Sequence, residues 1–257
     1  MDYTISAVDR AIGLLEALVD LPGAGVSDLA ERTGNTKSLT FRLLYTLEQR
    51  GFVAKDAERR TYSLGHRAML LGDQARRQSR LVTSAQPFMR ELGEKTEQNV
   101  LLLIRDGLCS ICVSLRSAPN PQRIFAEVGR RGPLYAGGGP KVLLAFAPEE
   151  VIDQVAAGPM TGFTTNTLKD GDSLRAALAT IRRDGWTVSE SELDYNTCSA
   201  AAPVRNQSGE VVAALSVTGS SDRMSGEAQR EVLDAVVSAS HRLSAMLGWG
   251  GAPFMAS

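Results

Sequence analysis

Residues 35–51, NTKSLTFRLLYTLEQRG, are the segment that most constrains how this chain folds. At 100° per residue, the spacing predicts a helix with four leucines on one side and Thr40 at the edge of that apolar stripe. The leucines are Leu39, Leu43, Leu44 and Leu47. Hydroxyls, cations and two aromatic rings gather on the opposite side, from Lys37, Ser38, Phe41, Arg42 and Tyr45. Asn35 or Thr36 can cap the start of this helix, and Gly51 can end it in a left-handed conformation.

The segments before residue 35 help to decide between two interpretations of this helix. Taken alone, it is either an ordinary amphipathic surface helix or a helix that reads DNA. Residues 4–20 repeat apolar side chains at helical spacing, and residues 21–25 interrupt them with proline and glycine. Residues 27–34 then form a short helix that ends at Gly34. Two helices joined by a tight glycine-containing turn are a helix-turn-helix unit, which favours DNA.

A short hairpin is predicted directly after Gly51. Two β-prone runs, residues 52–55 and 61–64, flank the charged turn DAERR. A hairpin in this position is a wing, and its tip carries Arg59 and Arg60, which can touch sugar-phosphate or the minor groove. From residue 37 to residue 80 the chain holds ten Lys and Arg against four Asp and Glu, although the whole chain has a net charge of −1. Phosphate binding requires such a concentration of cations, though a solvated basic face gives the same count.

The composition predicts a soluble, globular, cytoplasmic protein. The chain has 257 residues, enough for one large or two modest domains, with 43% hydrophobic and 22% charged residues. No apolar run approaches the roughly 20 residues of a membrane span, and the N-terminus lacks the basic start and apolar core of a secretory signal. We therefore expect no membrane partner.

An enzyme is the competing class, and the sequence offers little for it. Cys109 and Cys112 form a CxxC within a strand-like run, where residues three apart point to opposite faces. Cys198 lacks a plausible base, and the two histidines, His66 and His241, are far from any nucleophile in sequence. No Gly-x-Ser-x-Gly or metal-ligand cluster is present. We expect no catalytic residue, no metal and no cofactor. A purely architectural DNA-binding protein would leave the long C-terminal part unexplained.

The part of the chain after residue 65 predicts an α+β domain on a largely antiparallel sheet. Residues 66–82 and 83–98 have the pattern of two helices, and strand-like runs follow, with Asp106-Gly107 as a hairpin turn. Helices and strands then mix without regular βαβ alternation. Residues 137–141, GGGPK, lack the Gly-Lys-Ser/Thr order of a nucleotide-binding P-loop. This turn can be purely structural, or its helix start can receive a ligand oxygen, and the pattern alone leaves both open.

Several motifs in collinear order resemble the IclR family of transcriptional regulators. They extend from about residue 4 to residue 247 and include AVDRAIGLLEAL, VSDLAERTGNTKSLTFRLLYTLEQRGFV, TYSLGHRAMLLG, PLYAGGGPKVLLA, RRDGWTVSESE and AAAPVRNQSGEVVAALSVTG. The resemblance implies a winged helix-turn-helix domain over residues 1–65, a linker helix over 66–82 and a GAF-like effector-binding domain over 83–257. It also implies a homodimer or tetramer that binds double-stranded operator DNA, as repressor or activator, under the control of a small organic acid or aromatic metabolite. A small-molecule-transforming enzyme with an accessory DNA-binding domain remains the alternative.

The resemblance and the residue pattern together give two sets of site residues. The expected DNA contacts are Thr36, Lys37, Ser38, Phe41, Arg42, Tyr45, Arg59 and Arg60. Carried across position by position, the resemblance implies effector contacts at Ile124, Gly138, Gly139, Ser189, Ser199, Ser216 and Thr218. Some relatives carry an acid at the position of Ser189 and a cysteine at that of Ser199, so the ligand does not transfer directly. We expect the neighbours Glu190 and Cys198 to face away from the ligand.

Overall fold

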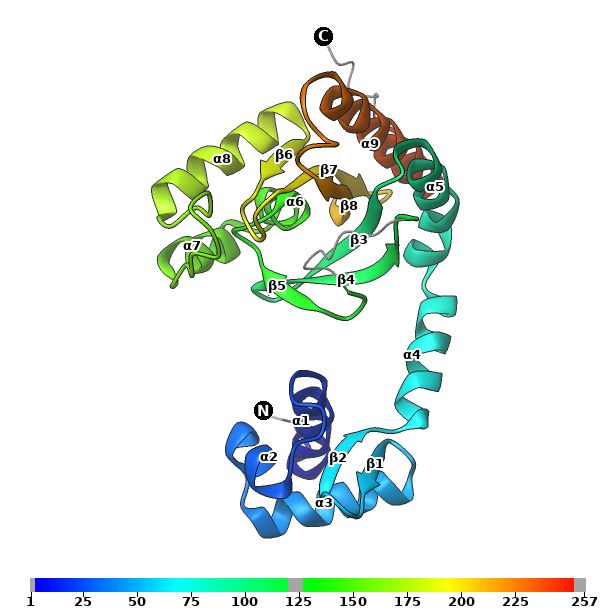
Figure 1. The fold of residues 1–257 in the computed structure, drawn as a ribbon, viewed down its shortest axis with the longest axis vertical. Helices are drawn as coiled ribbons and strands as arrows, with labels where there is room; N and C mark the ends of the chain where they lie inside the picture. Colours follow the sequence, from blue (N-terminus) through cyan, green and yellow to red (C-terminus); the bar gives the residue numbers. More distant parts are fainter. Residues whose placement is uncertain (1–2, 120–126, 252–257) are drawn as a thin grey trace. The chain divides into compact units, whose positions relative to one another are not determined.

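The computed structural model describes residues 3–119 and 127–251, and the chain divides into two compact units. The smaller unit ends at Ser79 and the larger begins at Arg80. Each unit is described by itself, with the element labels of Figure 1. Among the described residues, no helix is both long and apolar enough to cross a lipid bilayer.

The smaller unit is a three-helix bundle with a two-stranded wing, and a fourth helix follows the wing. Its elements are α1 (Ser6–Asp20), α2 (Val26–Thr33), α3 (Lys37–Gln49), β1 (Val53–Asp56), β2 (Thr61–Leu64) and α4 (His66–Gln78). Leucines of the three helices pack on Val53 and Tyr62 from the wing, which forms one apolar core. Gly34 and Gly51 have φ of 66° and 72°, the left-handed conformations that end α2 and α3.

The helix predicted over residues 66–82 breaks earlier than the sequence indicated. α4 ends at Gln78, Ser79 is extended (φ −72°, ψ 109°), and α5 runs from Arg80 to Thr96. α4 has no buried residue, so no packing holds its helix beyond Gln78. The buried stripe of α5 starts at Val82 and continues through Ala85 and Met89, which sets the register of the new helix.

The larger unit is built on one antiparallel sheet. Its strands follow the order β5-β4-β3-β8-β7-β6, and every pairing within it is antiparallel. The strands are β3 (Asn99–Asp106), β4 (Cys109–Arg116), β5 (Arg131–Pro133), β6 (Thr187–Glu190), β7 (Thr197–Arg205) and β8 (Val211–Ser220). The predicted hairpin at Asp106-Gly107 joins β3 to β4, and the predicted α+β class is confirmed.

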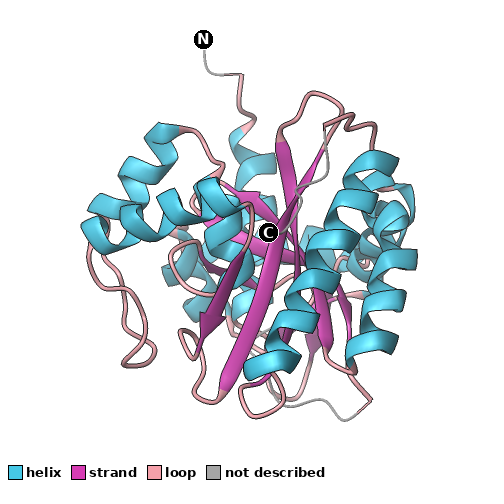
Figure 2. Ribbon diagram, turned by 90° about the horizontal axis from the view of Figure 1, so that it is seen from above, coloured by secondary structure: helices cyan, strands magenta, loops and turns pink. Residues whose placement is uncertain are grey.

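Helices lie on both faces of this sheet, as Figure 2 shows. α5 and α9 (Gly226–Met246) cover one face, where they pack on Val100, Leu102 and Leu215. α6 (Gly138–Ala145) and α8 (Gly171–Asp184) cover the other and pack on Leu101 and Leu103, with α7 (Glu149–Ala157) beside them. β3 is therefore apolar on both sides because each side meets a helical layer.

Candidate nucleic-acid interface and internal cavity

The front of α3 is exposed along its whole length. Lys37, Ser38 and Arg42 are exposed, and the rings of Phe41 and Tyr45 are 48% and 56% exposed. Thr36 caps the helix, because its hydroxyl accepts a hydrogen bond from the Leu39 N–H at 3.3 Å. A cap at this position fixes where the helix starts, and so which side chains form its front.

The back of α3 packs as predicted, with one difference. Leu44 is fully buried, and Leu39, Leu43 and Leu47 are partly buried. Thr40, predicted at the edge of the apolar stripe, is 0% exposed, and its hydroxyl has no hydrogen-bond partner among the described residues. α3 packs on both α1 and α2, which widens the buried stripe until it includes Thr40.

The wing turn presents its arginines through specific backbone geometry. The Asp56 carboxylate accepts hydrogen bonds from the N–H groups of Glu58 and Arg59, both at 3.0 Å. Arg60 has a φ of 56°, unusual for a residue with a side chain, and it closes the turn. The Arg59 side chain is 83% exposed, and its Nε lies 3.9 Å from the Asp56 carboxylate, which makes a weak surface ion pair.

A cavity lies in the larger unit between the start of α6 and the sheet. Its lining residues enclose about 740 Å³, open solvent at the mouth included. Six predicted effector contacts line it, namely Gly138, Gly139, Ser189, Ser199, Ser216 and Thr218. The seventh, Ile124, lies outside the described residues. The structure thus brings together residues from positions 138 to 218 around one space.

The two glycines at the start of α6 are required for packing. A Cβ on Gly138 would lie 2.9 Å from the Ser199 hydroxyl, and one on Gly139 would lie 2.7 Å from a Leu103 methyl. The Gly138 N–H donates to the Ser199 hydroxyl at 3.1 Å. Gly139 lies at the second helical position, whose N–H has no partner within the helix. The helix start is therefore pressed onto the sheet, and the Gly139 N–H, which has no partner within the helix, belongs to a residue that lines the cavity.

Hydroxyl groups form the sheet side of the cavity. Ser216 and Thr218 share one face of β8, and the register places Thr218 opposite Ser199. Leu215 and Val217 point to the other face, into the core beneath α5 and α9. Ser216 is buried and lines the cavity together with Thr218. Two hydroxyls on one wall can donate and accept hydrogen bonds, so this wall is suited to a polar ligand.

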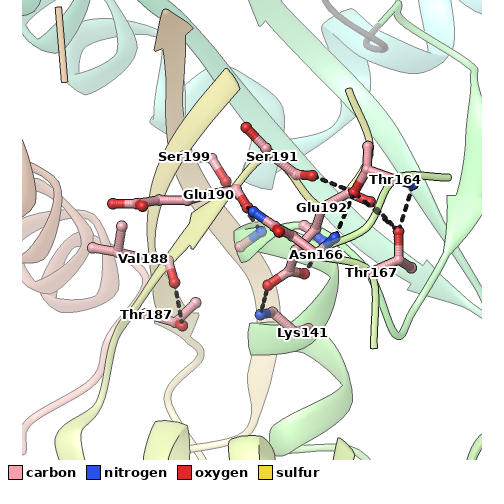
Figure 3. Close-up of polar contacts among 12 residues, drawn as sticks. Lys141, Thr164, Asn166, Thr167, Thr187, Val188, Glu190, Ser191, Glu192 and Ser199 are labelled. Carbon is pink, nitrogen blue, oxygen red and sulfur yellow. Dashed lines mark hydrogen bonds and ion pairs between the residues drawn. The ribbon is translucent and has the colours of Figure 1, made fainter. Parts of the chain in front are cut away.

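A buried ion pair at the cavity is the main feature that the sequence did not reveal. Lys141, on α6, donates from Nζ to Glu192 Oε1, and the Gly137 N–H donates to Glu192 Oε2 at 2.9 Å. Figure 3 shows the pair beside Ser199, with Thr164 and Thr167 on the neighbouring loop. Thr167 donates to the Glu192 carbonyl at 2.6 Å, so the loop of residues 158–170 fixes the backbone that carries this carboxylate.

Other residues that line the cavity were also missed. They are Leu101, Leu103, Ser110, Cys112, Arg130, Arg131, Gly132, Pro133, Gly137, Pro140, Leu193, Asp194 and Thr197. The apolar members lie in runs that are typical of an ordinary core, so their composition carries no signal of a cavity. Arg131 forms an ion pair with Asp106 at 2.9 Å, which brings a cation to the lining.

Comparisons with known proteins identify both units. Residues 7–57 match the IclR helix-turn-helix domain, and residues 74–245 match the family described as bacterial transcriptional regulator IclR C-terminal. The chain belongs to the IclR family. The fold class and the family predicted from the sequence are thereby confirmed, and transcription regulation through a helix-turn-helix domain is the activity of this class.

Members of the IclR family resemble this chain over nearly its full length. The HTH-type transcriptional regulator BhcR of Paracoccus denitrificans is 32% identical over 241 residues, which cover 93% of this chain and 86% of BhcR. KdgR of Escherichia coli is 29% identical over 252 residues, covering 98% and 96% of the two chains. A crystal structure of an IclR regulator from Alicyclobacillus acidocaldarius gives a TM-score of 0.86 at 26% identity, covering 96% and 100%.

One structural neighbour in the IclR family holds a bound small molecule. It is an IclR homologue from Microbacterium hydrocarbonoxydans, complexed with 4-hydroxybenzoate. The TM-score is 0.81 at 23% identity, and the match covers 94% of this chain and 98% of the neighbour. At this identity the comparison shows a shared fold.

Two of the three cysteines of this IclR-family chain, Cys112 and Cys198, are in poor surroundings for nucleophilic chemistry. Burial raises the pKa of the Cys112 thiol to about 11, which keeps it protonated near neutral pH. Burial also raises the pKa of Cys198. Cys198 and Glu190 face away from the cavity as predicted, and the Gln229 amide of α9 donates to the Glu190 carboxylate at 2.8 Å.

Proposed function

We propose that this IclR-family chain binds operator DNA through the front of α3 and the β1–β2 turn, and that a small organic ligand in the cavity changes its DNA affinity. The exposure of Phe41 and Tyr45 beside the cations of α3 carries this proposal. Two large rings on the face of a helix that packs well on its other side are typical of a binding surface. A bacterial regulator of chromosomal DNA works in the cytoplasm, and we propose that location.

The proposed DNA contacts divide by chemistry. Lys37, Arg42 and Arg59 supply charge-assisted hydrogen bonds to phosphates or guanine edges. Ser38, Phe41 and Tyr45 meet the groove through hydroxyl and ring contacts. Thr36, at the helix start, and Arg60, at the wing tip, complete the set and contact the backbone of the duplex.

The proposed effector is a small organic acid or aromatic metabolite. The cavity combines apolar walls from Leu101 and Leu103 with the hydroxyls of Ser199, Ser216 and Thr218. An aromatic or short aliphatic body fits such walls, and its oxygens can bond the hydroxyls and the Gly139 N–H. The 4-hydroxybenzoate of the Microbacterium homologue belongs to this class, which supports the same class here. Gly138, Ser189 and Ile124 are the remaining proposed contacts.

We propose a homodimer, or a tetramer formed from two dimers, on a partly palindromic operator. Apolar side chains are exposed on α1, at Val8 and Ile12, and on α4, where Met69 is 72% exposed and Leu70 lies beside it. Exposed apolar surface of this kind indicates a protein contact. A two-fold dimer would place two α3 helices in successive major grooves, which predicts half-sites about one helical turn apart.

Binding to DNA and to the ligand can be tested separately and then together. Fluorescence anisotropy measures binding to labelled DNA from upstream of the chain's own gene and its neighbours. A thermal-shift screen of aliphatic and aromatic acids identifies the ligand, and titration of that ligand into the DNA complex measures the coupling. We expect specific DNA binding, a stabilising acid, and a ligand-dependent change in affinity. Chemical turnover of the ligand would instead favour the alternative, an enzyme with an accessory DNA-binding domain.

A further inference from the structure

Glu192 stands between a buried cation and the cavity. Its carboxylate takes hydrogen bonds from Lys141 Nζ on one oxygen and from the Gly137 N–H, at 2.9 Å, on the other. Both side chains are nearly inaccessible to solvent, at 6% for Lys141 and 10% for Glu192. Glu192 lines the cavity, whereas Lys141 is absent from its lining. The cation thus reaches the cavity only through the carboxylate that covers it, whereas Gly137 lines the cavity itself.

Lys141 and Gly137 together have the chemistry of an anion-binding position. A protonated amine and a backbone N–H converge on two oxygens of one carboxylate, which is the arrangement that binds a free carboxylate tightly. In this chain the anion is covalently attached to the protein. It is also firmly held, because Thr167 donates to the Glu192 carbonyl and the Ser191 N–H donates to the Thr197 carbonyl, both at 2.6 Å.

We propose that Glu192 is the built-in occupant of this anion position and that it determines which end of the ligand can approach α6. This proposal rests on the proposed function for its ligand. A second carboxylate next to Glu192 would bring two negative charges together away from water, which is strongly unfavourable. The part of the ligand that reaches Glu192 is therefore an uncharged hydrogen-bond donor, such as a hydroxyl or amide. A carboxylate on the same ligand lies at the end remote from Glu192, toward the rest of the lining.

The test is the replacement of the built-in anion by a free one. Glu192→Ala removes a CH₂–COO⁻ fragment, and acetate is that fragment with one added hydrogen. The variant leaves Lys141 without its counter-ion beside the cavity, so acetate should bind and restore stability. In the full chain, with acetate replacing chloride at constant ionic strength, we expect the apparent Kd for acetate to be at least about tenfold lower in Glu192→Ala than in the unmodified chain. Above that Kd, each tenfold rise in acetate should raise the melting temperature of the variant by about 3–5 °C.

Two controls isolate the charge of the anion and the role of the lysine. Acetamide has the size of acetate without its charge and should leave Glu192→Ala unchanged. The double variant Lys141→Met/Glu192→Ala should lose the response to acetate. Three results would each overturn the proposal. Glu192→Ala and the unmodified chain could respond equally to acetate, or Glu192→Ala could respond equally to acetamide and acetate. The response to acetate could also survive in the double variant. The titration needs neither DNA nor an effector, so its result is independent of whether the proposed function holds.

A second variant covers the case in which Glu192→Ala does not fold. Glu192→Gln keeps the volume of the side chain and an oxygen that can accept a hydrogen bond from the Gly137 N–H. It removes the negative charge that pairs with Lys141. Adding Lys141→Met to Glu192→Gln removes the buried amine that has lost its counter-ion and should raise the melting temperature of the full chain. A lower melting temperature in Lys141→Met/Glu192→Gln than in Glu192→Gln would contradict the proposal that Glu192 occupies an anion-binding position.

Discussion

Two neighbouring positions on α3 should separate DNA binding from folding. Arg42 is exposed on the front of the helix, and Leu44, two residues later, is 0% exposed on its back. Replacing Leu44 with Ala removes a fully buried side chain and should lower the free energy of unfolding by about 2–5 kcal/mol. Replacing Arg42 with Ala touches no packed contact and should change it by less than about 0.5 kcal/mol.

The effects of the two substitutions on operator affinity should be the reverse of their effects on stability. If Arg42 reads a guanine, Arg42→Ala should weaken operator binding by about 1–3 kcal/mol, which is roughly 5- to 150-fold in Kd. Leu44→Ala should keep its operator affinity under conditions where the protein remains folded. Urea denaturation followed by circular dichroism gives the stability, and fluorescence anisotropy at one fixed salt concentration gives the affinity.

Either of two results would refute the proposed role of Arg42. Arg42→Ala could bind operator DNA like the unmodified chain, which would remove Arg42 from the interface. It could also lose more than about 1 kcal/mol of stability, which would mean that the front of α3 packs against something in the protein. Ser38→Ala, on the same exposed front, is a matched control for the stability measurement.

Three further predictions concern buried positions. Thr40→Val removes a hydroxyl without a partner at constant shape, so the free energy of unfolding should rise by about 1 kcal/mol in urea denaturation; a decrease would mean that the hydroxyl is hydrogen-bonded. Gly139→Ala places a Cβ 2.7 Å from a Leu103 methyl, which can turn into the cavity. Ligand stabilisation in a thermal-shift assay should therefore disappear at a stability cost of about 1–3 kcal/mol, and retained stabilisation would contradict this. The Cys112 thiol has a pKa of about 11 in the folded chain against an ordinary 9.0, so between these values the folded state keeps a proton that the unfolded state loses. In that pH range, the Cys112 thiol therefore lowers the free energy of unfolding by up to about 1.4 kcal/mol for each pH unit that the pH rises. Cys112→Ala should flatten that slope, and an unchanged slope would be the contrary result.

The sequence predicted those features that depend on local periodicity. The two faces of α3 follow from a 3.6-residue repeat, and the left-handed ends at Gly34 and Gly51 follow from glycine alone. Ser216 and Thr218 are two residues apart, so a strand places them on one face; that this face of β8 meets a ligand was implied by the family resemblance. Each of these signals lies within a few consecutive residues, where spacing and structure are directly related.

Features that depend on contacts between distant segments could not be predicted in the same way. Lys141 and Glu192 meet because α6 lies on the sheet beside the segment after β6, and nothing near either residue indicates a buried partner. The apolar run of β3 does not distinguish Leu101 and Leu103 at the cavity from Leu102 in the opposite core. The break at Ser79 was also missed, because the exposed residues of α4 carry no packing pattern that marks its end.

Coupling between the two proposed sites is the most direct test of the account. The acid that most stabilises the full chain is titrated into a complex of the chain with its labelled operator, and the operator Kd is measured with and without saturating acid. We expect a change of about 5- to 150-fold, together with an equal change in the affinity for the acid when operator is present. A ligand that occupies the cavity while the operator Kd stays the same would contradict the account.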